Sequence, residues 1–114
     1  MKLVNAKIHG MIDYTVVIFL WVSPLVFGLS GATELLIYAL GGVHLALTML
    51  TNFKLGLIKV IPLQVHGWIE FIVGIVLMAS PLLMGDSNFA NHYFLAFFGC
   101  AVLLTWLMND YDQH

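Results

Sequence analysis

Four long apolar stretches divide the sequence. Each contains only scattered polar residues, and they lie at residues 8–28, 34–52, 66–85 and 90–108. A helix that crosses the hydrocarbon core of a bilayer needs about 20 mostly apolar residues. The pattern therefore predicts four transmembrane helices. Lys2 and Lys7 precede the first stretch, as basic residues precede the core of a signal peptide. We expect a retained helix instead, because a closely similar stretch returns in mid-chain.

The segments between these stretches predict the topology. Residues 28–33 (GLSGAT) and 85–91 (GDSNFAN) are rich in Gly, Ser and Asn, so we expect them to be turns within two antiparallel hairpins. The linker at residues 52–64 (NFKLGLIKVIPLQ) is amphipathic, and we expect it to lie along the membrane interface. With four spans, the linker and both termini share one side of the membrane. All the lysines fall on that side: Lys2, Lys7, Lys54 and Lys59. An excess of lysine marks the cytoplasmic face, which predicts that both termini are cytoplasmic.

The two halves of the chain repeat one another. Residues 9–28 (HGMIDYTVVIFLWVSPLVFG) return as residues 66–85 (HGWIEFIVGIVLMASPLLMG), an offset of 57 residues (66 − 9) in a chain of 114. Repeats of this kind decide the architecture. We expect a single all-α membrane domain over residues 1–114, built from two parallel two-helix repeats, 1–57 and 58–114. The result is a four-helix bundle with a pseudo-two-fold axis along the membrane normal.

Composition supports the membrane and excludes other classes. The chain is 61% hydrophobic and 9% charged with a mean hydropathy of +0.99, whereas soluble domains are about 25% charged. The net charge of −2 and the absence of arginine argue against nucleic-acid binding, because such proteins carry a strongly basic surface. The single Cys100 excludes an internal disulfide and is best interpreted as a small apolar residue. The expected partner is the lipid bilayer. The sequence leaves a homo-oligomer open and identifies no protein partner.

Small residues and prolines have architectural roles in this pattern. Glycines in transmembrane helices allow close helix packing, and the candidates are Gly41, Gly42, Gly74 and Gly99. A Ser-Pro pair followed by glycine ends the first and third stretches, at Ser23, Pro24 and Gly28 and at Ser80, Pro81 and Gly85. Proline removes a backbone donor, and the serine hydroxyl can bond a freed carbonyl. We therefore predict a kink or helix stop at these positions rather than a catalytic serine.

Candidate chemistry lies at the opposite ends of the same helices. His9 and Asp13 are four residues apart and share one helix face, and His66 with Glu70 repeats that pair. The hairpin topology brings both pairs to the inner half of the membrane. Supporting polar residues on the returning helices are His44, Thr48, Asn52, Thr105 and Asn109. His44 has no histidine counterpart, because Ala101 occupies the matching position. Ionisable groups in a membrane are costly and usually mark a function or face the bundle interior.

Three interpretations of this polar cluster stay open. A structural one is a hydrogen-bond clamp in which the acids bond to Thr and Asn across the bundle and fix helix register. A second is a site that binds a divalent cation or relays protons, because two imidazoles and two carboxylates suit transition metals. A third is bis-histidine haem ligation by His9 and His66, with Gly10 and Gly67 leaving room for the ring. The sequence shows none of the motifs of soluble enzymes and indicates no substrate.

The duplicated H-G-x-I-[DE]-[YF] and S-P-L-x-x-G segments resemble the SPW-repeat family of small bacterial membrane proteins. The resemblance covers nearly the whole chain, including the linker LGLIKVIPLQVH at residues 55–66. Leu25 and Leu82 stand where the family motif has its tryptophan. The resemblance implies a four-helix protein of the bacterial inner membrane. It implies no particular biochemical activity.

Overall fold

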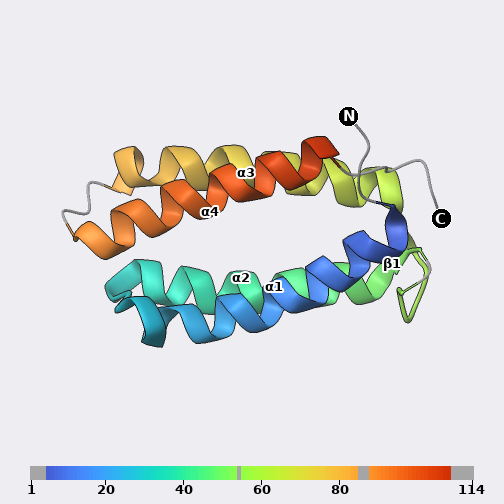
Figure 1. The fold of residues 1–114 in the computed structure, drawn as a ribbon, viewed down its shortest axis with the longest axis horizontal. Helices are drawn as coiled ribbons and strands as arrows, with labels where there is room; N and C mark the ends of the chain where they lie inside the picture. Colours follow the sequence, from blue (N-terminus) through green and yellow to red (C-terminus); the bar gives the residue numbers. More distant parts are fainter. Residues whose placement is uncertain (1–4, 54, 85–87, 109–114) are drawn as a thin grey trace.

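The computed structural model is all-α and describes residues 5–53, 55–84 and 88–108. Within these ranges it contains four long helices (Figure 1), which are α1 (Ala6–Phe27), α2 (Gly31–Leu50), α3 (Leu63–Met84) and α4 (Phe89–Met108). They pack chiefly as two hairpins, α1 against α2 and α3 against α4. Both hairpin turns lie at one end of the molecule, and the connection between the hairpins lies at the other. The sequence pattern therefore predicted the helices and their pairing.

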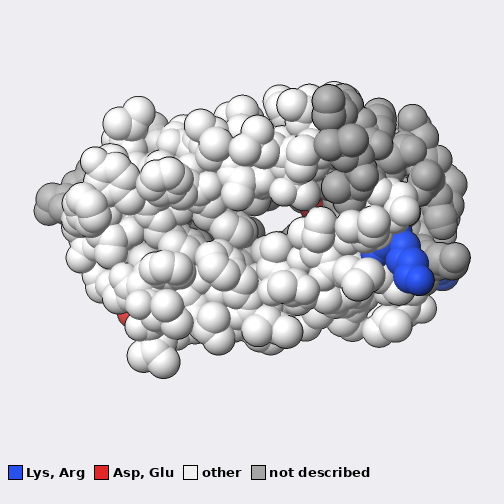
Figure 2. Space-filling model, in the orientation of Figure 1, with Lys and Arg blue, Asp and Glu red and all other residues white. Residues whose placement is uncertain are grey.

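All four helices are long and apolar enough to cross a membrane. Their outward surfaces carry large apolar side chains, and Leu25, Leu82 and Leu83 are at least 80% exposed. Such a surface suits lipid rather than water. On the face drawn in Figure 2, positive charge gathers at the end that carries the connection between the hairpins. The structure thus indicates an integral membrane protein with lysines at one end. Lys2, Lys54 and the acidic C-terminal residues lie outside the described residues.

Local bonds explain where α1 begins and ends. The Asn5 side chain accepts a hydrogen bond from the Ile8 amide at 2.9 Å, which caps the first turn. Gly28 adopts a left-handed conformation (φ 66°), and its amide donates to the Pro24 carbonyl. Pro24 lies inside the last turn, and Ser23 Oγ donates to the Phe19 carbonyl at 2.5 Å. The Ser-Pro-Leu-x-x-Gly segment therefore ends α1, as predicted.

The matching segment of α3 behaves in a similar way. Pro81 lies in its last turn, and Ser80 Oγ donates to the Leu77 carbonyl at 2.8 Å. Both serines thus bond to their own helices and serve the helix end. Gly85 lies outside the described residues.

The prediction that the second helix extends to residue 52 is wrong. Helix α2 ends at Leu50, and Asn52 belongs to the short strand β1 (Thr51–Asn52), which pairs in parallel with β2 (Ile61–Pro62). The helix stops because the linker amides take its last carbonyls: Leu57 and Ile58 donate to Met49, and Val60 donates to Leu50. Asn52 therefore does not share a helix face with Thr48.

The linker folds back under the helix ends and contributes to the interior. Phe53 and Leu63 are buried together, with Leu55 and Trp106 packed against them. Lys59 Nζ donates to the Phe53 carbonyl at 2.6 Å. Leu57, Ile58 and Val60 are more than half exposed at the same end of the molecule. The linker thus has one buried face and one apolar outer face.

Glycines create the closest helix contacts. Gly41 lies beneath the Trp21 ring, and Gly74 lies beneath Leu103. A Cβ on Gly99 would meet the Met78 amide nitrogen at 2.8 Å and the Gly74 carbonyl oxygen at 3.0 Å, which are backbone atoms that cannot turn aside. Gly42 has open space around it, so its predicted packing role is wrong.

Gly99→Ala should therefore separate α3 from α4 and destabilise the protein by about 1–3 kcal/mol, the usual cost of overpacking. Gly42→Ala, at the matching position of the other repeat, should leave stability unchanged or raise it by up to about 1 kcal/mol through helix propensity. Thermal unfolding in detergent, followed by circular dichroism, measures both. Equal melting temperatures for the two variants would contradict this packing.

Candidate metal centre

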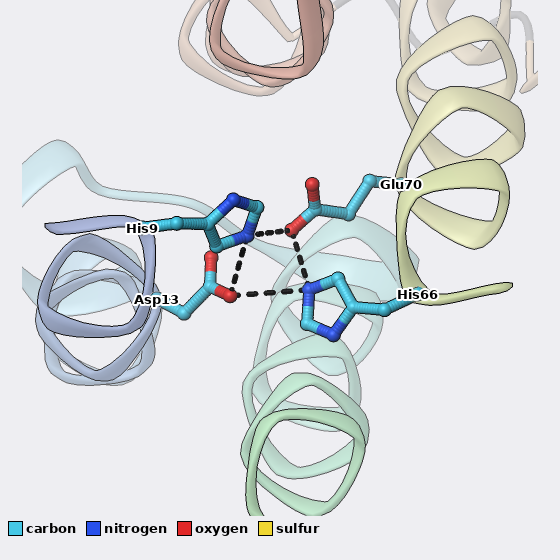
Figure 3. A group of neighbouring side chains, drawn as sticks. All are labelled: His9, Asp13, His66 and Glu70. Carbon is cyan, nitrogen blue, oxygen red and sulfur yellow. Dashed lines mark hydrogen bonds and ion pairs between the residues drawn. The ribbon is translucent and has the colours of Figure 1, made fainter. Parts of the chain in front are cut away.

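The two predicted His/acid pairs meet between α1 and α3. His9 and Asp13 lie one turn apart on α1, and His66 and Glu70 lie one turn apart on α3. Figure 3 shows the four side chains pointing toward a common centre. One ligand atom from each residue lies within 4.8 Å of the other three. The i,i+4 spacing on each helix and the packing of the two hairpins together produce this convergence.

The four converging atoms form a closed ring. His9 Nε2 lies 2.8 Å from Asp13 Oδ2 and 3.1 Å from Glu70 Oε1. His66 Nε2 lies 2.8 Å from Glu70 Oε1 and 3.1 Å from Asp13 Oδ2. Each nitrogen therefore contacts both oxygens, and each oxygen contacts both nitrogens. Two of the four contacts join different hairpins, so the ring also links α1 to α3.

The ring is almost completely removed from solvent. His66 is 0% exposed, His9 2%, Asp13 3% and Glu70 7%. Burying a charge is expensive unless an opposite charge or a metal ion compensates it. The acids and imidazoles compensate one another here.

Protons alone cannot satisfy all four contacts. Each Nε2 atom carries at most one proton and directs it toward one acceptor. The contacts of Glu70 Oε1 with His9 and His66 have hydrogen-bond geometry. Asp13 Oδ2 is buried and forms ion pairs with His9 Nε2 at 2.8 Å and with His66 Nε2 at 3.1 Å, but among the described residues neither contact has the hydrogen-bond geometry of the Glu70 contacts. A cation at the centre of the ring would satisfy Asp13 Oδ2 together with the other three atoms.

Thr51 orients one of the imidazoles. Its Oγ1 lies 2.6 Å from the Leu47 carbonyl oxygen and 2.7 Å from His66 Nδ1. A carbonyl can only accept, so the single hydroxyl proton goes to Leu47 and His66 Nδ1 must donate to Thr51. This arrangement leaves the Nε2 lone pair of a neutral His66 facing the ring. Metal-bound histidines are held in the same way by a hydrogen bond at their other nitrogen.

The linker closes the cluster on the side of the helix ends. Phe53 is 1% exposed, and its ring lies 6.5 Å from the His66 ring, centroid to centroid. A Cβ on Gly10 would overlap the Phe53 side chain, so glycine is needed beside His9 for this packing. Tyr14 Oη donates to the Leu55 carbonyl at 2.9 Å and fixes the linker against α1.

The supporting residues differ in how near they come to the ring. His44 Nε2 lies 3.4 Å from Asp13 Oδ1, so His44 joins the cluster from α2. Thr48 Oγ1 donates to the His44 carbonyl and Thr105 Oγ1 to the Ala101 carbonyl, each within its own helix. The expectation that the acids bond to threonines is therefore wrong for these hydroxyls. Asn52 lies in β1, and Asn109 lies outside the described residues.

The geometry opposes the haem interpretation. The His9 and His66 rings lie 5.1 Å apart, centroid to centroid, and are nearly perpendicular at 78°. Carboxylate oxygens occupy the space in which both Nε2 atoms point. The space above Gly10, expected to hold a macrocycle, is filled by Phe53. A porphyrin cannot fit between these imidazoles without rebuilding the site.

Thr51→Val should change the protonation of His66, because it removes the acceptor for Nδ1–H. At alkaline pH, where His66 is neutral, we expect the wild-type ring to carry its proton on Nδ1 and the Thr51→Val ring to shift toward the Nε2-protonated tautomer. Thr51→Ser keeps the hydroxyl and should behave as wild type. Nitrogen-15 NMR of histidine-labelled protein reports both ring nitrogens. An unprotonated Nδ1 in the wild type would show that Thr51 is the donor and contradict the assignment.

Comparison with known proteins does not assign the chain to a family. No protein-family model, curated protein or solved structure matches it. The resemblance to the SPW-repeat family therefore stays a prediction.

Proposed function

We propose that this chain is a small integral membrane protein that binds one divalent transition-metal ion between α1 and α3. The ligands are His9 Nε2, Asp13 Oδ2, His66 Nε2 and Glu70 Oε1. The observation that carries the proposal is the closed, buried ring of these four atoms. A metal ion is the one ligand that uses all four atoms at once.

Charge balance supports a divalent ion. Two carboxylates supply two negative charges, and two neutral imidazoles supply none, so a divalent cation makes the buried site neutral. Without metal, two protons on the imidazoles give the same neutrality. Metal binding then releases protons, because ligands must be deprotonated. The site can therefore exchange protons for one metal ion without leaving a net charge inside the membrane. In this proposal, the proton relay expected from the sequence is the release and uptake of protons that accompany metal binding and release.

Distances and ligand types favour particular metals. A tetrahedral zinc ion with bonds of about 2.0–2.1 Å keeps its ligand atoms about 3.3 Å apart. The four neighbouring contacts of 2.8–3.1 Å need to open by a few tenths of an ångström to reach that spacing, and the two distances across the ring, which are within 4.8 Å, must shorten as the ring puckers around the ion. Imidazole with carboxylate suits Zn²⁺, Fe²⁺ or Mn²⁺ rather than the soft ions that prefer thiolates. The thiol of Cys100 is exposed and is not one of the grouped residues.

The proposed setting is the inner membrane of a bacterium. In it the helices form a four-helix bundle of two parallel repeats, surrounded by lipid. The end that carries Lys7 and Lys59 faces the cytoplasm, because lysines concentrate on that side. The metal centre then lies within the cytoplasmic half of the membrane, since His9 and His66 follow the helix starts at that end. The SPW-repeat resemblance is consistent with this setting.

A second candidate function is a structural clamp. The contacts between His9 and Glu70 and between Asp13 and His66 each join the two hairpins at 3.1 Å. Removing one partner of a buried ion pair leaves an uncompensated charge and costs about 3–5 kcal/mol. Such a clamp fixes the register between hairpins whether or not metal binds. Both candidates predict unstable variants, so stability alone does not separate them.

Zinc titration of the purified protein in detergent separates the two functions. Wild type should bind one Zn²⁺ per chain, more weakly as the pH falls, and zinc at 100 times its dissociation constant should stabilise it by about 2.7 kcal/mol. Glu70→Gln and Asp13→Asn should weaken zinc binding by about 100-fold or more, because each removes a ligand. Glu34→Gln, at the other end of the molecule in the first turn of α2, is the matched control and should change nothing.

Two results would contradict the metal proposal. The first is a wild-type protein whose melting temperature does not respond to zinc. The second is a Glu70→Gln protein that binds zinc as tightly as wild type. If both variants lower the melting temperature and zinc has no effect on any protein, the structural clamp is the better account.

A further inference from the structure

A cavity lies next to the metal centre on the side away from the linker. It has a volume of about 100 Å³, and both metal-ligating acids, Asp13 and Glu70, line it. Eleven of its other lining residues are apolar, and the remaining two are His44 and Thr105. Figure 2 shows the molecule hollowed between the two hairpins, with acidic atoms at the edge of the hollow. The cavity is therefore an apolar chamber with polar groups gathered at the metal centre.

The two sides of the metal centre differ. On the linker side, Thr51 and Phe53 are buried against His66 and Gly10. On the cavity side, the carboxylates border open space. Structural metal sites are closed by protein ligands, whereas sites that react with or sense a ligand keep a position open. The cavity lies where such a position is needed.

The repeat is broken at the wall of the cavity. His44 on α2 and Ala101 on α4 occupy matching positions in the two halves, 57 residues apart (101 − 44), and both line the cavity. A second histidine in place of Ala101 would take up much of this room. His44 Nε2 is buried and makes no hydrogen bond to any described residue. It lies 3.4 Å from Asp13 Oδ1 at the cavity wall, beside the space that a molecule bound to the metal would occupy.

We propose that the cavity is an open coordination position of the metal, which takes a small uncharged molecule the size of dioxygen or nitric oxide. This proposal rests on the metal site proposed above. The cavity has ample room for such a molecule, because one water needs about 10–15 Å³ of such volume and a diatomic molecule somewhat more. The apolar walls disfavour an anion, whose burial there costs free energy without a compensating partner.

The cavity also lies on a route from the bilayer. Val43 lines it and is 62% exposed on the outer surface of α2. A second, larger apolar cavity of about 660 Å³ shares Val16, Phe98 and Ala101 with it and extends toward the opposite end of α1 and α4. Small apolar molecules dissolve in lipid and can enter by these openings, whereas ions cannot. Both the apolar lining of the cavity and its openings toward the lipid therefore favour an uncharged ligand.

Nitric oxide binding to Fe²⁺-loaded protein tests the proposal. The protein is loaded anaerobically in lipid nanodiscs, and electron paramagnetic resonance detects the high-spin iron–nitrosyl. Wild type should bind one nitric oxide per iron. Ala101→Phe fills the cavity and should weaken nitric oxide binding at least tenfold with the iron content unchanged, and Ala101→Leu should have an intermediate effect. Ala46→Phe places the same ring on the exposed surface of α2, outside both cavities, and should have no effect.

The outcomes separate this inference from the metal site itself. Iron retained by wild type without a nitrosyl signal would overturn the open position and leave the metal site standing. Azide that binds as tightly as nitric oxide would overturn the preference for an uncharged ligand. Equal nitric oxide affinity in wild type and Ala101→Phe would show that the cavity is not the binding position. Failure of wild type to hold iron would overturn this inference, and the zinc titration then decides separately whether the metal site stands.

Discussion

The structure depends on mutual neutralisation of charges buried between apolar helices. Asp13 and Glu70 cannot stay ionised in such surroundings without positive partners, and the histidines cannot be charged there without the acids. The ring of four side chains meets both needs within contacts of 2.8–3.1 Å. Because two of those contacts cross between the hairpins, the same interaction that neutralises the charges also holds α1 against α3. Any metal ion that replaces the protons inherits both roles.

Much of this structure is predictable from the sequence, for identifiable reasons. The length of each apolar stretch predicts a transmembrane helix, because the thickness of a bilayer sets how many apolar residues are needed to cross it. The duplication gives the cluster, because two identical spacings in two similarly oriented hairpins bring His9, Asp13, His66 and Glu70 to the same depth. The helix end after Pro24 follows from the lost backbone donor and from the conformational freedom of Gly28.

Other features depend on contacts that no local pattern encodes. Helix α2 ends at Leu50 because linker amides reach back to Met49 and Leu50, which no helix-stop residue in the sequence signals. Thr51 therefore contacts His66, and Asn52 lies in β1 instead of on the face of α2 that carries Thr48. Phe53 fills the space over Gly10 for the same reason. The only hint in the sequence is Pro62, which shows that the linker turns before α3 but not where it packs.

X-ray absorption spectroscopy of the zinc-loaded wild-type protein reports the atoms bound to the metal and therefore tests whether the four side chains are its ligands. The account predicts four nitrogen or oxygen ligands at about 2.0–2.1 Å, with the outer-shell scattering of two imidazoles. A spectrum with sulfur ligands, or with a zinc ion coordinated only by water, would contradict a centre built from His9, Asp13, His66 and Glu70.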